Sequence, residues 1–241
     1  MTLKKQFITL LAFSALSCLS PKKETFKDHA PGIRVVGAMR NVMHKGDMTD
    51  KVALDTISSR KGLYGLGPLS HLKGELLINN GKSYISKVSE NWGMEVTQSY
   101  KAASPFFVYA KVEEWEEIIL PHTITTIKDV EKFIEEKTSK TTAAFAFKLE
   151  GEVAYARIHV LNLPEGTKVS SPSEAHQGQI DYEIKDEEAE IVGFYSTSHQ
   201  GVFTHHDSNV HMHLITANER KMGHLDDLRI KKMKLYLPAE S

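Results

Sequence analysis

Apolar residues recur along most of the chain either at every second position or in short runs, a pattern that predicts a protein built mainly from β-strands. Two of these runs flank Asn79-Asn80-Gly81, a sequence typical of a tight hairpin turn. The segments expected to be strands are 33–39, 72–78, 83–88, 106–112, 141–149, 152–160, 190–196, 210–216 and 229–237.

Only two segments have the apolar spacing of a helix. One is 50–59, with Asp50 as its N-cap, and the other is 128–137, where Thr126 and Asp129 resemble a capping box. The three glycines of 62–69 predict a loop, and the polar stretch 162–188 predicts a long surface excursion. The expected fold class is therefore α+β, dominated by sheet.

The first residues have the pattern of an export signal. Lys4 and Lys5 precede an apolar run over 7–16 that is too short to span a membrane. Cys18 follows where a bacterial lipoprotein is cut and lipidated, although Ala15 stands where Leu is usual; a plain signal peptide is the alternative. We expect a signal over 1–18, a tether over 19–31, one domain over 32–241, and a lipid-anchored protein of the cell envelope.

Composition narrows the function classes. Of 241 residues, 41% are hydrophobic and 25% charged, and the net charge of -1 gives no electrostatic footprint for nucleic acid. Cys18 is the only cysteine, so the sequence excludes an intrachain disulfide. The chain has 12 histidines, and six of them fall between His199 and His224, which is a hint of a metal or acid–base site.

The histidine-rich region contains a candidate metal site. On a strand over 210–216, His211 and His213 point to the same side, because side chains alternate between faces. A polar turn over 216–222 then returns the chain so that His224 can approach them. Three neutral imidazoles of this kind form an open metal site. The alternative is a polar face on an exposed sheet.

Several motifs together resemble the α-acetolactate decarboxylase family over about residues 58–238. They are Gly65-Leu66-Gly67-Pro68-Leu69-Ser70-His71-Leu72-Lys73-Gly74-Glu75-Leu76, the Asn-Gly hairpin, Ser104-Pro105-Phe106, Ile191-Val192-Gly193-Phe194, His211-Met212-His213 and Gly223-His224. The resemblance implies two mixed or antiparallel sheet lobes and a zinc enzyme. Its small-molecule substrate would be 2-acetolactate, converted to acetoin and CO₂, and a homodimer is left open.

The resemblance also implies roles for particular residues. His211, His213 and His224 match the metal ligands of the family, and Glu75 matches its catalytic carboxylate. The reaction independently needs a Lewis acid for the charge left as CO₂ departs and an acid that returns a proton to carbon. A cation should hold the substrate carboxylate. Arg157 is preferred to Lys148 for its bidentate fork, although a solvated strand arginine is the alternative.

The chain also departs from the family pattern. Family members bring a further glutamate from a C-terminal tail, and Glu240 does not match its position; Lys73 replaces an acidic residue before Gly74. Five further histidines are interpreted as exposed imidazoles: His159, His176, His199, His205 and His206; hydrogen-bond donors behind the metal ligands are the alternative for His205 and His206. The missing tail glutamate favours the alternative function, a non-catalytic or altered-substrate envelope relative that keeps the metal site as a ligand-binding module, whereas the histidine triad with Glu75 favours the enzyme.

Overall fold

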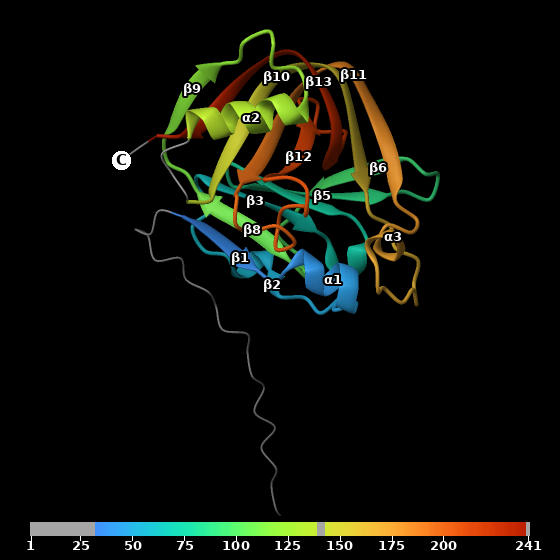
Figure 1. Ribbon diagram of the computed structural model, residues 1–241. Helices are drawn as coiled ribbons and strands as arrows, with labels where there is room; N and C mark the ends of the chain where they lie inside the picture. The colour runs from blue at the N-terminus through green and yellow to red at the C-terminus, as the bar shows by residue number, and fades with distance from the viewer. Residues whose placement is uncertain (1–31, 139–142, 240–241) are drawn as a thin grey trace, which may run out of the picture.

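The structure is a computed structural model that describes residues 32–138 and 143–239. The chain forms two large antiparallel sheets and a short two-stranded one, with few helices (Figure 1). The expected sheet-dominated fold with two sheet lobes is confirmed. The predicted signal peptide with Cys18 and the tether lie outside the described residues.

The first sheet has six strands, and each of them pairs antiparallel with its neighbours. Asn80 and Gly81 form the predicted hairpin turn with φ of 47° and 80°. The order across this sheet is β1 (Ile33–Val36), β8 (Phe107–Lys111), β3 (Leu63–Pro68), β4 (Glu75–Asn79), β5 (Lys82–Val88) and β6 (Met94–Gln98). The short sheet pairs β2 (Val52–Ala53) with β7 (Ala103–Ser104).

The second sheet is built from long strands and closes on itself. Its order is β10 (Phe145–Val160), β11 (Ile180–Tyr195), β12 (Val210–Thr216), β13 (Met222–Pro238) and β9 (Trp115–Ile119). Because β10 pairs with both β11 and β13, the strands from β10 to β13 make a closed ring. The ring leaves β10 and β13 without a free edge where they pair, which is how sheets avoid unpaired backbone groups.

Three α-helices and two short 3₁₀ turns complete the described chain. They are α1 (Met39–Lys45), α2 (Ile127–Lys137), α3 (Pro172–Ala175) and the turns Leu54–Thr56 and Ser70–Leu72. The predicted capping box at α2 is confirmed, since the Thr126 hydroxyl accepts from the Asp129 N–H and the Asp129 carboxylate accepts in return. Among the described residues, no helix is long and apolar enough to cross a membrane.

The two large sheets pack face to face through one apolar cluster. Tyr64, Leu66 and Val108 come from the first sheet, and Val192 and Phe194 come from the second. All five side chains are nearly removed from solvent. Each buried side chain of this size stabilises the fold by about 1.5–3 kcal/mol. This cluster therefore fixes how the sheets lie on each other, and with it the relative position of any groups carried at their contact.

The glycine-rich segment 62–69 is a central strand, not the predicted loop. Its residues from Leu63 to Pro68 form β3, between β8 and β4. The glycines are needed for packing: a Cβ on Gly65 would lie 2.7 Å from the Phe107 ring. The three glycines predict a loop, but glycine is also required in a strand where a neighbouring ring approaches the backbone closely.

The N-terminal helix prediction is also wrong. Residues 50–59 contain β2 and a 3₁₀ turn, whereas a helix, α1, begins at Met39, at the end of the segment predicted as a strand over 33–39; β1 confirms the first part of that strand. α1 ends at Gly46, which adopts the left-handed conformation with φ of 63°. Its buried face, with Met39, Val42 and Met43, packs on Phe106.

Two predicted boundaries in the second sheet are wrong for a common reason. The segments 141–149 and 152–160 are predicted as separate strands, but β10 is one strand from Phe145 to Val160, continuous through Gly151, whose φ is 143°; residues 141 and 142 lie outside the described residues. Residues 180–188, expected in a surface excursion, belong to β11. This part of β11 is polar because several of its side chains face solvent, while its backbone pairs with β10. Pairing with a partner strand outweighs local polarity.

We predict that Gly151→Ala destabilises the protein far more than Gly166→Ala, although both glycines have positive φ. A Cβ at Gly151 would lie 2.2 Å from the Lys232 carbonyl oxygen, whereas one at Gly166 would meet nothing within 4 Å. Backbone strain alone costs about 1 kcal/mol, and the added clash raises the loss at Gly151 to about 3 kcal/mol or more. Urea unfolding of both variants measures this, and equal losses would contradict it.

Candidate metal and catalytic site

The predicted histidine strand exists and its histidines are buried. β12 covers Val210–Thr216, as expected, and His213 pairs directly with His224 on β13. Relative exposures are 4% for His211, 1% for His213 and 7% for His224. The alternative interpretation, a polar face on an exposed sheet, is therefore excluded. Burial without a ligand would leave imidazole nitrogens unsatisfied, which is costly.

The three histidines meet the geometric needs of a metal centre. One ring nitrogen from each of His211, His213 and His224 lies within 4.8 Å of the other two. Within the described chain, Nδ1 of all three and Nε2 of His213 have no hydrogen-bond partner. Nitrogen ligands at about 2.0–2.1 Å from a tetrahedral zinc lie about 3.3 Å apart, so modest ring rotations would close the set. The residues present fit a divalent ion.

The site keeps these imidazoles neutral. Burial lowers the pKa of His211 and His224 well below the usual range, and neighbouring histidines lower both further. For His213, burial and then His159 lower the pKa to about 3. A neutral ring offers a lone pair to a metal, whereas a protonated ring does not. The histidines are thus in the metal-binding form at neutral pH.

Glu75 comes from the first sheet and faces the histidines of the second. It opens β4 directly after Gly74, where φ is 149° and a Cβ would lie 2.1 Å from the Ser86 carbonyl oxygen. Its side chain is 2% exposed, with Oε2 at 3.7 Å from Nε2 of His213. Its Oε1 accepts a hydrogen bond from the Leu161 N–H at 3.4 Å. Burial raises the pKa of Glu75 well above its usual range, and the charge of Asp226 raises it further.

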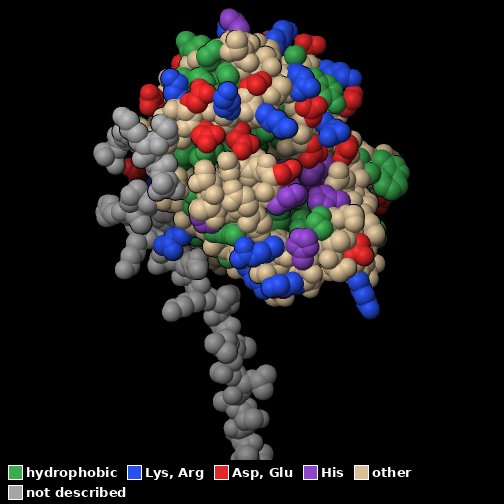
Figure 2. Space-filling model, viewed as in Figure 1, with side chains coloured by type: hydrophobic (Ala, Val, Ile, Leu, Met, Phe, Trp, Pro, Cys, Tyr) green, Lys and Arg blue, Asp and Glu red, His purple; other side chains and the backbone are tan. Residues whose placement is uncertain are grey.

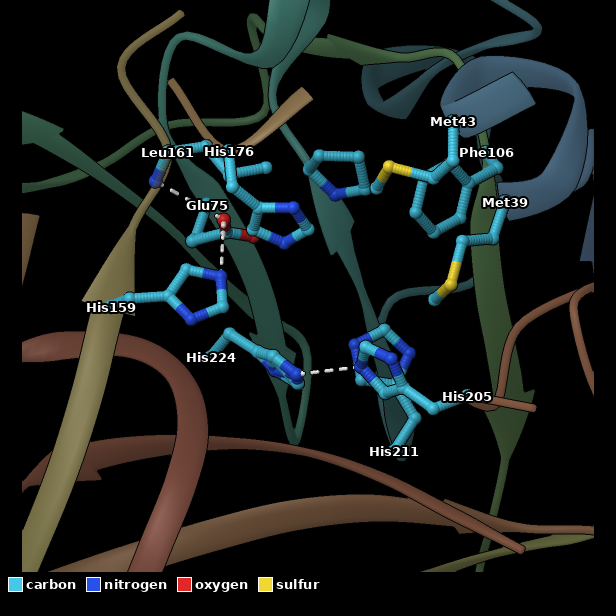
Figure 3. A pocket seen from close by; sticks show the side chains of 11 residues that line it. Met39, Met43, Glu75, Phe106, His159, Leu161, His176, His205, His211 and His224 are labelled. Carbon is cyan, nitrogen blue, oxygen red and sulfur yellow. Dashed lines mark hydrogen bonds and ion pairs between the residues drawn. The ribbon is translucent and has the colours of Figure 1, made fainter. Parts of the chain in front are cut away.

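His159 was interpreted as an exposed imidazole, but the structure places it beside Glu75. Its exposure is 5%, and its Nε2 lies 4.0 Å from Glu75 Oε1 (Figure 3). Its Nδ1 lies 2.9 Å and 3.0 Å from the two carboxylate oxygens of Asp226, which fixes the ring orientation. The only signal in the sequence was its position on a predicted strand, which does not say which face is buried.

Two further histidines also face the site rather than solvent. His205, in the loop before β12, stacks on His224 with their Nε2 atoms 3.1 Å apart. His176, at the end of α3, meets His159 edge-on. Both are partly buried, and burial lowers the pKa of each. The clustering of histidines after His199 was the available signal for His205; nothing comparable pointed to His176.

Arg157, the predicted carboxylate-binding residue, is not brought into the site. It is exposed on β10, opposite Asp227 and Glu183 in the strand register. Lys148 pairs with Glu150 and lies over the Tyr236 ring, with Nζ 4.3 Å from the ring centre. Alternation would put Arg157 and His159, two residues apart, on the same face of β10. The pairing of β10 with β13 shifts its register between Arg157 and Ile158, and on the two sides of this irregularity Arg157 is exposed while His159 is buried.

These side chains surround a cleft of about 300 Å³, including the part open to solvent. Its polar wall consists of Glu75, His159, His176, His205, His211 and His224, and its apolar wall of Met39, Met43, Pro68, Phe106 and Leu161 (Figure 3). Histidine side chains also gather at the surface between the two layers of the molecule (Figure 2). None of the described residues that line this cleft is a lysine or an arginine.

Fold and site together define a sheet-built protein with a buried histidine centre of the type that binds a metal. A model of the alpha-acetolactate decarboxylase family matches residues 36–239. The chain therefore belongs to that family, as the motifs predicted. The relatives that it matches are named alpha-acetolactate decarboxylase, an enzyme of the carboxy-lyase class.

The similarity to individual relatives is distant. The alpha-acetolactate decarboxylase of Lactococcus lactis strain IL1403 is 26% identical over 197 residues, covering 81% of this chain and 77% of the relative. That of Methanosarcina mazei is 24% identical over 172 residues; the match covers 71% of this chain and spans only 57% of the relative's length.

Solved structures agree on the fold. The alpha-acetolactate decarboxylase of Bacillus subtilis strain 168 superposes with a TM-score of 0.69 at 20% identity, covering 85% of this chain and 83% of that one. A Staphylococcus aureus protein of unknown function, similar to alpha-acetolactate decarboxylase, gives a TM-score of 0.71 at 16% identity and covers 85% and 84%. At these identities the likeness shows a shared fold.

We predict that His213→Ala removes bound metal while His206→Ala does not. His213 is central in the buried set, and His206 is exposed in the preceding loop. Purified protein dialysed against zinc should retain about one ion per chain, and His213→Ala should retain far less. Elemental analysis after gel filtration measures the content, and circular dichroism checks folding. Equal zinc content in His213→Ala and wild type would refute the ligand assignment.

We also predict that the metal-free protein loses stability as pH falls from 6.5 to 5. The unfolded chain then protonates His211, His213 and His224, while the folded protein keeps them neutral, so acid favours unfolding. Each histidine contributes up to about 1.4 kcal/mol per pH unit. Glu75 opposes this above pH 4.5, because its raised pKa makes the folded state hold one extra proton.

The unfolded chain still binds more protons than the folded protein, because the three histidines take up more protons on unfolding than Glu75 releases. Urea unfolding in the presence of a chelator at several pH values measures it. His213→Asn should flatten the profile, whereas His122→Asn, at an exposed position, should leave it parallel to wild type. A profile that is flat in the wild type would contradict the prediction.

Proposed function

We propose that this chain is a zinc-dependent carboxy-lyase that converts 2-acetolactate to acetoin and CO₂. The observation that supports this most is the arrangement of three buried, neutral histidines facing a buried carboxyl group across the contact between two sheets. Membership of the decarboxylase family supports the choice of reaction. Three imidazoles and an open position suit zinc, which is why we name this ion.

His211, His213 and His224 would hold the ion. When bound, zinc supplies a Lewis acid that stabilises the negative charge developing on the substrate oxygens as CO₂ leaves. Within the described residues the rest of the polar wall adds no lysine or arginine. The ion is thus the one strong positive charge that this proposal places in the cleft, which makes metal content and activity inseparable.

Glu75 is the proposed proton donor. The carbon that loses CO₂ must gain one proton, and the raised pKa of the Glu75 carboxyl group favours its protonated form, which can donate one. Because Glu75 is held on one side of the cleft, it would deliver this proton to one face of the carbon and so give one stereoisomer. Its Oε2 lies on the histidine side, 3.7 Å from His213 Nε2.

His159 and Asp226 would position Glu75. The Asp226 carboxylate accepts a hydrogen bond from His159 Nδ1–H, and the other ring nitrogen, Nε2, faces Glu75 Oε1 at 4.0 Å. That nitrogen can hold the carboxyl group in one orientation. His159 thus takes a place in the site that the sequence had given to Arg157, two residues earlier on the same strand.

The proposal predicts that zinc-loaded protein given racemic 2-acetolactate forms acetoin, and that Glu75→Gln lowers kcat by about 10²–10⁴-fold. Glutamine keeps the size of the side chain but cannot return a proton. Zinc content should remain that of wild type in this variant. Acetoin is measured by colorimetry, and its stereochemistry by chiral gas chromatography.

Glu116→Gln, which makes the same change at an exposed position on β9, is the matched control and should retain full activity. If wild type binds zinc but forms no acetoin, the decarboxylase proposal fails and the ligand-binding alternative is supported. If Glu75→Gln keeps its activity, the role of Glu75 as proton donor is wrong while the reaction stands.

A further inference from the structure

The helix α1, which carries none of the site's histidines, contributes two of the five apolar residues that line the cleft. Met39 and Met43, one turn apart on α1, point toward the cleft beside Phe106, across from Glu75 and His159 (Figure 3). Exposures are 8%, 6% and 4% for Met39, Met43 and Phe106. The cleft therefore has two chemically distinct sides, one of imidazoles and carboxyl and one of thioether and phenyl groups.

The backbone of this wall is firmly held. The N–H groups of Met39 and Arg40 donate to the carbonyls of Val202 and Gly201, each at 2.8 Å, in the loop that also carries His205. The far end of α1 is fixed at Gly46, where a Cβ would lie 2.6 Å from the Val169 carbonyl oxygen. The methionine side chains are unbranched and flexible on this fixed support, so they adapt to ligands of different shape.

The substrate has a matching division of polar and apolar groups. In a 2-hydroxy-3-oxo acid, C2 carries a hydroxyl, a carboxylate, an acyl group and one alkyl group. The three oxygen-bearing groups favour the side with the histidines and Glu75, which offers hydrogen bonds and would hold the metal ion of the proposed function. Because C2 is tetrahedral, the alkyl group then points away from that side, toward the apolar wall.

We propose that Met39, Met43 and Phe106 form the subsite for the alkyl group on C2 and set the length of alkyl group that the protein accepts. This inference rests on the proposed function, since it takes the substrate to be a 2-alkyl-2-hydroxy-3-oxo acid. Met43 controls the limit together with Met39, because shortening either side chain opens space next to the wall without touching the polar side.

The test compares kcat/KM for substrates with methyl, ethyl and propyl groups on C2. Each CH₂ group that is buried against an apolar surface raises kcat/KM about fourfold. In Met43→Ala and in Met39→Ala, the propyl-to-methyl ratio should rise about tenfold over wild type. Val42→Ala is the matched control: it shortens a buried side chain of the same helix that does not line the cleft, and should leave the ratio within about twofold.

A second measurement separates this inference from the proposed reaction. Calorimetry with zinc-loaded protein measures binding of unreactive 2-hydroxy-2-methylpropanoate and its longer 2-alkyl homologues. Relative to wild type, the two methionine variants should bind the longer homologues more tightly than the methyl compound, by about the same factor as the change in the propyl-to-methyl ratio of kcat/KM. Val42→Ala should show no such preference. This readout needs no turnover, and using two methionine variants covers the case in which one of them folds poorly.

The outcomes are distinct. If the protein turns over the substrates but the propyl-to-methyl ratio changes no more in the methionine variants than in Val42→Ala, the subsite is wrong and the decarboxylase proposal stands. Absence of turnover with the predicted shift in binding overturns the decarboxylase and supports the subsite. If neither turnover nor binding of the alkyl series is detected, both proposals are wrong. Turnover with the predicted shift in ratio supports both.

Discussion

Burial of His211, His213, His224 and Glu75 at the contact between two sheets is the constraint on which this structure depends. Each buried polar group without a partner costs about 1–3 kcal/mol. Packing of the large apolar cluster between the sheets offsets that cost, and a metal ion would offset more of it by using the free nitrogens. The same burial lowers the pKa of the three imidazoles and raises the pKa of the Glu75 carboxyl group, so stability and chemistry have one physical origin.

The backbone is shaped to bring these groups together. Gly223 lets β13 approach β10 closely, since a Cβ there would lie 2.4 Å from the His159 carbonyl oxygen, and this places His159 against His224. Gly74, directly before Glu75, lets the start of β4 approach β5 closely, since a Cβ there would lie 2.1 Å from the Ser86 carbonyl oxygen. The closed pairing of β10 with both β11 and β13 then holds the histidines of the second sheet in a frame with little freedom.

Some members of the site could be found from the sequence because a local pattern determines them. Alternation along a strand puts His211 and His213 on one side, and the next turn returns His224, but spacing alone left a polar surface face as the alternative. The family resemblance favoured the metal site and gave Glu75, after Gly74, its role. Arg157 is exposed and does not line the cleft, whereas His159, two residues later on the same strand, does; the register shift between Arg157 and Ile158 breaks the alternation, and no local pattern in the sequence indicates such a shift.

The sequence by itself determined the sheet-dominated fold class, the hairpin at Asn80-Gly81, the capping box of α2 and the histidine triad, since each depends on residues close together in the chain. Tertiary structure decided the rest. It made the glycine-rich segment a core strand, placed α1 over the cleft, and turned His159 and His205 inward. These outcomes depend on contacts between segments far apart in the chain, and the energy of such contacts exceeds local preference.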